Sequence, residues 1–140
     1  MRITAALADT SFLFALTNPK DRNHDRVLNV ARILSDKIII PTPVLPEISY
    51  LIASRLGHNC MRRFLNELVI NDSTFEAITA NDLKRVVEIL EQYAESQLDF
   101  VDATIIAIAE RRKICRILTL DRRDFSIVRP RHCSYFEILP

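Results

Sequence analysis

Short apolar runs alternate along this chain with stretches in which apolar side chains recur at helical spacing. Each run is too short for a helix and ends at polar or chain-breaking residues, which is typical of a strand buried in a sheet. Five such runs predict strands at residues 3–8, 37–41, 74–79, 114–120 and 135–139, the last of them at an edge of the sheet.

The stretches between these runs predict helices. Apolar residues follow the spacing of one helix face in residues 12–16, 25–34, 43–56, 61–68, 81–94 and 99–112. Thr42 and Pro43 suit the cap and the first position of the third helix, and Gly57 suits its end. The last helix is apolar almost all round, which predicts that it is buried. Residues 121–125 are expected to form a turn.

Strands that alternate with helices predict an α/β fold with a short, mostly parallel sheet of four to five strands and helices on both faces. The chain has 140 residues and contains no repeats or linker-like stretches. This length is enough to bury a core without disulfides, so we expect a single domain that spans residues 1–140. In such sheets, ligands bind beyond the carboxyl ends of the strands.

Composition excludes several kinds of site. Gly57 is the only glycine, so the chain cannot contain the dinucleotide-binding fingerprint, the nucleotide-binding loop or the nucleophile elbow. The histidines, His24, His58 and His132, stand too far apart in sequence for a histidine-rich zinc motif. The chemistry is therefore expected from carboxylates, hydroxyls and bound ions.

Cysteine usage and hydropathy bear on the cellular compartment. The three cysteines form no CxxC pair, zinc ribbon or disulfide framework, which is typical of a reducing compartment, so we expect a cytoplasmic protein. No apolar run approaches the roughly 18 residues of a membrane span. Asp9 interrupts the apolar N-terminal stretch, so no targeting segment is expected either.

Four carboxylates stand where carboxylates are unusual. Asp9 and Asp121 directly follow two predicted strands, whereas Glu47 and Asp102 fall among apolar residues of predicted helices. A lone carboxylate in such surroundings costs several kcal/mol unless a cation or donor compensates it. Local alternatives exist for each. Asp9, Asp102 and Asp121 suit capping or turn positions, with Asp99 as the cap of the helix that carries Asp102. Glu47 suits a surface edge.

Together, these four acids would meet at the carboxyl edge of a parallel sheet. Carboxylates this close repel one another unless cations hold them. Ligands that are all oxygen favour Mg²⁺ or Mn²⁺ over zinc, and such an ion activates water for the hydrolysis of a phosphodiester bond. The pattern therefore predicts a metal-dependent nuclease site.

Charge is divided unevenly along the chain, although its net value is only +1. Residues 67–102 carry nine acids against two bases, and residues 111–132 carry eight Lys and Arg against two acids. A basic segment beside an acidic site suits contacts with the phosphates of a nucleic acid. Arg122 and Arg123, which follow Asp121, are the first candidates for such contacts.

The residues around these acids resemble the four acidic motifs of PIN-domain ribonucleases. The motifs are Asp9-Thr10-Ser11-Phe12-Leu13, Pro46-Glu47-Ile48-Ser49-Tyr50-Leu51, Leu98-Asp99-Phe100-Val101-Asp102-Ala103 and Leu118-Thr119-Leu120-Asp121-Arg122-Arg123-Asp124-Phe125. Their order and spacing, and the length of the chain, are most similar to the VapC-type toxins of bacterial toxin–antitoxin pairs. The resemblance covers essentially the whole chain.

This resemblance implies an endoribonuclease that requires Mg²⁺ or Mn²⁺, cleaves RNA, forms a homodimer and is silenced by a cognate antitoxin protein. The catalytic acids that it implies are Asp9, Glu47, Asp102 and Asp121. Ser11 and Thr119 would assist at the substrate site through hydrogen bonds. The metal ligands that we expect are Asp9, Asp102, Asp121 and Asp124, and Asp124 could complete a second, weaker metal site.

Two other functions are considered. A haloacid-dehalogenase-like phosphohydrolase also places an aspartate after a strand, but it needs a second aspartate two positions later, where this chain has Ser11. A non-catalytic PIN-like module that binds RNA or protein would be expected to lack one or more acids, and all four are present.

The apolar helices around Leu51 and Phe64 could present a groove for an antitoxin segment, or their side chains could instead close the core or a homodimer.

Overall fold

The structure is a computed structural model and describes residues 4–140. Its centre is a sheet of five strands in which every adjacent pair is parallel. The strands are β1 (Ala5–Ala8), β2 (Lys37–Pro41), β3 (Thr74–Glu76), β4 (Arg116–Leu118) and β5 (Glu137–Leu139). Their order is β3-β2-β1-β4-β5, so β1 is central. The predicted parallel α/β sheet is confirmed, with the C-terminal strand at an edge.

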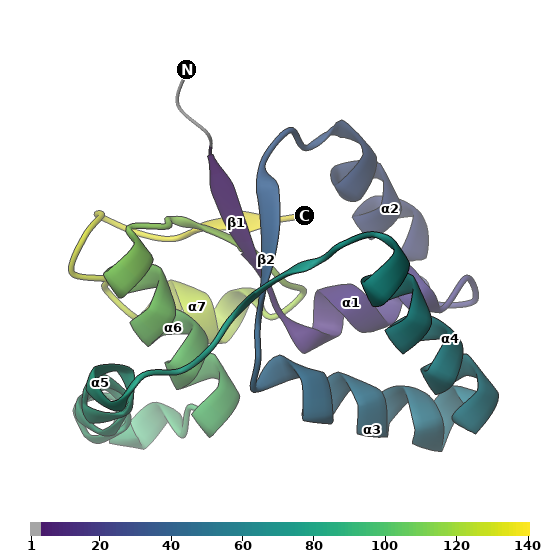
Figure 1. Ribbon diagram of the computed structural model, residues 1–140. Helices are drawn as coiled ribbons and strands as arrows, with labels where there is room; N and C mark the ends of the chain where they lie inside the picture. The colour runs from purple at the N-terminus through teal and green to yellow at the C-terminus, as the bar shows by residue number, and fades with distance from the viewer. Residues whose placement is uncertain (1–3) are drawn as a thin grey trace.

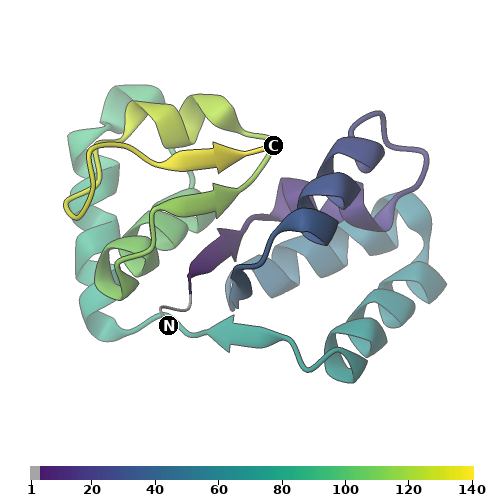
Figure 2. The ribbon, with the colours of Figure 1, turned by 90° about the horizontal axis from the view of Figure 1, so that it is seen from above.

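Helices lie on both sides of this sheet. Figure 1 shows α1 to α4 gathered on one side and α5 to α7 on the other, and the view from above shows the same division (Figure 2). The helices are α1 (Thr10–Thr17), α2 (His24–Ile33), α3 (Val44–Leu56), α4 (His58–Ile70), α5 (Ala80–Gln92), α6 (Phe100–Arg112) and α7 (Arg122–Ile127). No helix within residues 4–140 is long and apolar enough to cross a bilayer.

The central strand shows why the apolar runs are continuous rather than alternating. Consecutive side chains of a strand point to opposite faces of the sheet, yet Ala6, Leu7 and Ala8 are all fully buried. Leu7 pairs in register with Ile39 of β2 and Ile117 of β4, which are buried as well. Both faces are therefore covered, as expected for a parallel sheet between two layers of helices.

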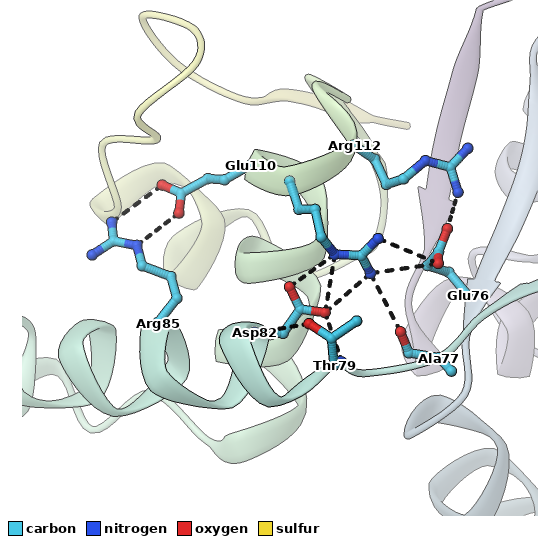
Figure 3. A network of polar contacts seen from close by, with 8 residues as sticks. Glu76, Ala77, Thr79, Asp82, Arg85, Glu110 and Arg112 are labelled. Atoms are coloured by element: carbon cyan, nitrogen blue, oxygen red, sulfur yellow. Dashed lines mark hydrogen bonds and ion pairs between the residues drawn. The ribbon is translucent and has the colours of Figure 1, made fainter.

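Helix α6 is buried, as predicted, and ion pairs join it to α5. Its residues 102–110 are all buried. Arg85 of α5 donates from Nε to Glu110 Oε1 at 2.7 Å and from Nη2 to Oε2 at 3.2 Å (Figure 3). Arg111 donates from Nε to Asp82 Oδ1 at 3.0 Å. Burial is the largest single effect and raises the pKa of both carboxyls. The guanidinium hydrogen bonds, the arginine charges and main-chain hydrogen bonds together outweigh it and hold each pKa below its usual range.

The predicted turn at residues 121–125 is wrong, because the short helix α7 begins there. The side chain of Asp121 accepts a hydrogen bond from the main-chain N–H of Asp124 at 3.2 Å and so caps the helix. Phe125 is fully buried and packs edge-on against Phe136, with ring centroids 6.4 Å apart. A helix of 6 residues carries too little periodicity to be recognised in a sequence.

Strand β3 stops three residues before its predicted end at residue 79. It ends at Glu76 because Thr79 caps α5, where Thr79 and Asp82 form a capping box. Strand β4 is likewise shorter than the predicted 114–120. Residue 3 of the first predicted strand lies outside the described residues.

The boundaries of the longer helices agree with prediction within three residues. Thr42 does not cap α3 through its side chain, since the helix begins at Val44 and Pro43 occupies the cap position. Gly57 ends α3 as predicted. Its φ of +99° is a conformation that residues with a side chain rarely adopt.

Candidate active site

Asp9 lies where the carboxyl ends of β1 and β4 meet. Its main-chain N–H donates to the carbonyl oxygen of Leu118 at 2.9 Å, which ties the two strand ends together. Its carboxylate accepts a hydrogen bond from the N–H of Thr10 at 2.7 Å and forms the cap of α1. Only 5% of Asp9 is exposed. The residue therefore caps a helix and also occupies the sheet edge where the sequence placed it.

Two hydroxyl groups contact the second oxygen of Asp9. Thr119, which is fully buried, donates from Oγ1 to Asp9 Oδ2 at 2.7 Å. Ser11 Oγ lies 3.3 Å from the same oxygen and 3.1 Å from Thr119 Oγ1. Each hydroxyl also accepts a main-chain N–H at 3.0 Å, Ser11 from Leu120 and Thr119 from Asp121. Both hydroxyls thus bond protein groups and fix the carboxylate between β1 and β4.

Asp102, Asp121 and Asp124 converge beside Asp9. One carboxylate oxygen from each of the three lies within 4.8 Å of the other two. Asp102 belongs to the first turn of α6, is 6% exposed, and donates its main-chain N–H to Asp99 Oδ1 at 2.8 Å. Asp121 caps α7, and Asp124 lies in its first turn. The starts of two helices therefore deliver these three carboxylates to one place.

Glu47 reaches the same place from α3, but its surroundings differ from the prediction. Its carboxylate accepts a hydrogen bond from Thr10 Oγ1. Of the two positions considered for Glu47, the surface edge is correct and burial among apolar residues is wrong, because the residue is exposed. Val44 and Ile48 are fully buried and turn one face of α3 to the core, whereas Glu47 lines the cleft on another face.

All these acids line one open cleft of about 380 Å³. The lining residues are Asp9, Thr10, Ser11, Glu47, Tyr50, Leu51, Asp99, Asp102, Asp121 and Asp124. Six of them are carboxylates, and among residues 4–140 no Lys, Arg or His belongs to the lining. The cleft is therefore strongly acidic and open to solvent.

Burial and crowding raise the pKa values of the acids. Burial above all raises the pKa of Asp102 to about 9, and the charges of Asp99, Asp9 and Asp121 add to this effect. Burial also raises the pKa of Asp9 to about 6, against the opposing hydrogen bond from Thr119. It raises the pKa of Asp121 in the same direction. In the absence of a cation, the cluster therefore retains protons that these groups would lose in water.

The donor set fits a hard divalent cation. The converging ligand atoms are carboxylate oxygens, which Mg²⁺ and Mn²⁺ prefer, and a cation would supply the positive charge that the cleft lacks. Asp102, Asp121 and Asp124 have the close spacing that shared coordination requires. Asp9 lies next to this trio and lines the same cleft, with both of its oxygens in hydrogen bonds.

The two arginines predicted to contact phosphate are placed differently. Arg122 turns toward the C-terminal end of β5, where its Nη2 donates to the carbonyl oxygen of Ile138 at 3.4 Å and to that of Pro140. Arg123 is exposed, and its Nη1 lies 4.0 Å from Asp124 Oδ1. Of the two arginines, Arg123 therefore lies next to an acid of the cluster, whereas the guanidinium group of Arg122 bonds main-chain carbonyls at the end of β5.

Arg22 and Arg26 line a second, basic hollow of about 250 Å³ together with Arg122. Thr119 and Leu120 also line this basic hollow, and they are hydrogen-bonded to Asp9 and Ser11 of the acidic cleft. Sequence reasoning missed Arg22 and Arg26, because they are nearly one hundred positions away from β4 and two arginines near a helix start are common. Only the packing of the α1–α2 segment against the sheet edge brings them here.

Phe64 does not contribute to an apolar groove beside Leu51. That side chain is buried in the core, which agrees with the alternative that it closes the core. Leu51 lines the acidic cleft beside Tyr50, and Tyr50 is exposed.

Residues 6–129 match the model of the PIN domain family, and the chain therefore belongs to that family. It is 28% identical over 134 residues to Ribonuclease VapC26 of Mycobacterium tuberculosis, an alignment that covers 96% of this chain and 99% of that protein. This agrees with the resemblance of the acidic motifs to VapC-type ribonucleases. The haloacid-dehalogenase-like alternative is thereby set aside.

Solved structures share the fold. VapC20 of M. tuberculosis, described as a sarcin-ricin loop cleaving toxin, superposes with a TM-score of 0.83 at 24% identity, covering 96% of this chain and 99% of that one. VapBC2 of Rickettsia felis, bound to a DNA fragment from its promoter, superposes with a TM-score of 0.72 at 14% sequence identity. This match covers 98% of this chain and 100% of that one. A toxin–antitoxin complex from Klebsiella pneumoniae superposes with a TM-score of 0.65 at 18% sequence identity, and this match covers 86% of this chain and 90% of that one.

Proposed function

We propose that this chain is the ribonuclease toxin of a type II toxin–antitoxin pair and that it cleaves RNA internally with Mg²⁺ or Mn²⁺. One observation carries the proposal: in a PIN domain, Asp102, Asp121 and Asp124 bring carboxylate oxygens within 4.8 Å of one another beside Asp9. A module that only binds a partner gains nothing from such a cluster, since like charges this close oppose folding.

Each acid has a role in this proposal. Asp102, Asp121 and Asp124 would hold the cation, and Asp9 would contact it from the edge of the sheet. When bound, the cation acts as a Lewis acid that neutralises phosphate charge and activates water. Glu47 stands exposed on the α3 side of the cleft, where the oxygen that does not bond Thr10 can accept a proton from the attacking water.

Ser11 and Thr119 act as positioning residues. Their hydroxyls bond Asp9 Oδ2 and accept the main-chain N–H groups of Leu120 and Asp121. One network therefore sets the Asp9 carboxylate and the segment that carries Asp121 relative to each other. Fixed ligands of this kind reduce the reorganisation needed at the moment of reaction.

RNA must approach an acidic cleft, so cations are needed beside it. Arg22, Arg26 and Arg122 line the basic hollow, and Arg123 is exposed next to Asp124. We place the phosphates that flank the scissile bond in this hollow, because guanidinium groups bind phosphate in two-pronged hydrogen bonds.

A cognate antitoxin protein, a homodimer and a cytoplasmic location belong to the same proposal. A ribonuclease without restraint would damage its host, and the structural relatives from R. felis and K. pneumoniae include toxin–antitoxin complexes. Exposed apolar side chains offer contact surface for a partner: Tyr50 at the cleft, and Val69 and Ile70 at the end of α4.

Metal-dependent cleavage of an end-labelled RNA tests the proposal. Protein stripped with a chelator should leave the RNA intact, and added Mn²⁺ or Mg²⁺ should restore cleavage at internal positions. The proposal fails if the folded protein cleaves equally well in excess chelator. It also fails if no RNA, free or ribosomal, is cleaved with either metal.

A further inference from the structure

Cys115, His132 and Cys133 come together away from the acidic cleft. Cys115 directly precedes β4, whereas His132 and Cys133 lie in the loop of residues 128–136 between α7 and β5. One ligand atom from each lies within 4.8 Å of the other two. The acidic cleft lies beyond the carboxyl end of β4 and this trio lies at its amino end, so the two groups occupy opposite edges of the sheet.

The imidazole of His132 is oriented in the way that a metal ligand requires. Its Nε2 lies 2.7 Å from the carbonyl oxygen of Ile114, so Nε2 carries the proton and Nδ1 carries the lone pair. Nδ1 is buried and has no hydrogen-bond partner in the part of the chain that the structure describes. Histidines that bind a metal usually donate one ring N–H to a carbonyl or carboxylate and turn the other nitrogen to the ion.

The thiols of Cys115 and Cys133 both lie close to the His132 ring in space, although Cys115 is 17 positions earlier in the chain. Cys133 Sγ is 3.5 Å from Nε2, on the side of the ring that bonds Ile114. Ligand atoms around a tetrahedral zinc ion lie about 3.5 to 3.8 Å apart, so the Cys133 side chain must rotate from Nε2 toward Nδ1 to close the trio around one ion. A disulfide between Cys115 and Cys133 would use the two sulfurs but leave His132 Nδ1 without a partner. A metal ion would bind both thiols and Nδ1 at once.

The backbone that carries these side chains is held in place. The N–H of Arg131 donates to Glu110 Oε2 at 2.9 Å, and the N–H of Glu137 donates to the carbonyl of Cys115 at 2.8 Å. Cys115 lines a hollow of about 420 Å³ and His132 lines another of about 350 Å³.

We propose that Cys115, Cys133 and Nδ1 of His132 bind one Zn²⁺ ion, with water as the fourth ligand. Thiolate and imidazole ligands favour zinc, whereas the carboxylates of the acidic cleft favour Mg²⁺ or Mn²⁺. The ion clips the loop 128–136 to the start of β4 and so holds the edge strand β5. The site is independent of RNA cleavage.

Cobalt titration tests this site without any measurement of cleavage. In reduced, chelator-treated protein, the thiolate-to-cobalt charge-transfer absorption should saturate at one equivalent of Co²⁺ bound to the thiols, and Zn²⁺ should displace it. Co²⁺ held by the carboxylates of the acidic cleft does not give this absorption. Cys115→Ser and Cys133→Ser should each lose this absorption. His132→Gln should weaken Co²⁺ binding by more than about tenfold. Cys60→Ser, which removes the remaining thiol on α4, should behave as wild type.

A second readout covers variants that fail to fold. In the unmodified chain, Zn²⁺ should protect Cys115 and Cys133 from alkylation and should leave Cys60 as reactive as before. Absence of the charge-transfer band in wild-type protein would overturn the proposal, as would equal alkylation with and without zinc. Isolation of a Cys115–Cys133 disulfide in protein that holds no zinc would also overturn it.

Discussion

The hydroxyl of Thr119 donates to the carboxylate of Asp9 at 2.7 Å, although 110 positions separate the two residues along the chain. The parallel pairing of β1 with β4 brings them together, because Ala8 pairs with Leu118 and each site residue follows its strand directly. The register of two central strands therefore sets the position of an acid on which the proposed metal site depends.

Replacing Thr119 by Val should impair RNA cleavage more than it impairs folding. The variant keeps the volume but removes the buried donor to Asp9 Oδ2, so the free energy of unfolding should fall by about 1 to 2 kcal/mol. Cleavage should fall by about ten- to a hundredfold because the carboxylate is misplaced. Thr104→Val is the control, since Thr104 is buried in α6 and bonds only the carbonyl of Phe100. Normal cleavage by Thr119→Val would contradict the positioning role.

Metal-free protein should lose stability as the pH rises. The pKa of Asp102 is raised from 3.8 to about 9, and that of Asp9 is raised from 3.8 to about 6. Over this interval the unfolded chain has lost protons that the folded chain keeps, so the free energy of unfolding falls as the pH increases. Urea unfolding in excess chelator measures this slope.

Two changes should flatten that slope. Asp102→Asn removes the group with the largest shift, and saturating Mn²⁺ replaces the retained protons with a cation. Stability of the chelated wild type that rises with pH between about 5 and 9 would be opposite in sign to the raised pKa values.

Two glutamates that share one arginine should differ sharply in their contribution to stability. Glu110 is 8% exposed and pairs with Arg85 through two hydrogen bonds, so Glu110→Gln should lower the free energy of unfolding by about 3 kcal/mol. Glu88 is 54% exposed and pairs with the same arginine, so Glu88→Gln should cost less than about 1 kcal/mol. Urea unfolding measures the loss in the free energy of unfolding for each variant. Equal losses would contradict the larger contribution expected of the buried ion pair.

Removing Arg22 and Arg26 should weaken RNA binding and reduce its dependence on salt. If both guanidinium groups contact phosphates, the slope of log affinity against log salt should become shallower by about 1.4 for single-stranded RNA. Binding is measured in chelator, so that the RNA stays intact. Lys84→Ala with Arg129→Ala removes the same charge at exposed positions outside the hollow and should change the slope less. An equal change in the two double variants would contradict a specific phosphate site.

The sheet and two of the site acids could be predicted because their signals are local. A mainly apolar run followed by an acid marks both Asp9 and Asp121, although β4 itself ends at Leu118, and the parallel sheet then puts these ends on one edge. Glu47 lines the cleft with the other acids, as expected, but its exposure could not be predicted, because periodicity gives the neighbours of a helical residue and not the side on which a cleft opens. Helix α7 was missed because a cap and one buried phenylalanine are its main determinants.

Sites assembled from distant segments were beyond sequence reasoning. The spacing of the cysteines and histidines excludes zinc motifs that are local in sequence, whereas Cys115 meets His132 and Cys133 only because β5 pairs beside β4. Arg22 and Arg26 reach the site in the same indirect way. Sequence patterns carry no information about such encounters until the strand order is known.

Asp102→Asn tests the central claim most directly, with Mn²⁺-dependent RNA cleavage and metal-free stability measured on the same preparation. We expect cleavage to fall by at least about a hundredfold because a metal ligand is lost. Stability in chelator at neutral pH should be unchanged or higher, because the amide of this variant folds uncharged, whereas the Asp102 carboxyl must take up a proton when the metal-free protein folds. Asp72→Asn, an exposed position outside the cleft, should leave both unchanged. Cleavage by Asp102→Asn at the wild-type rate would contradict the assigned metal site.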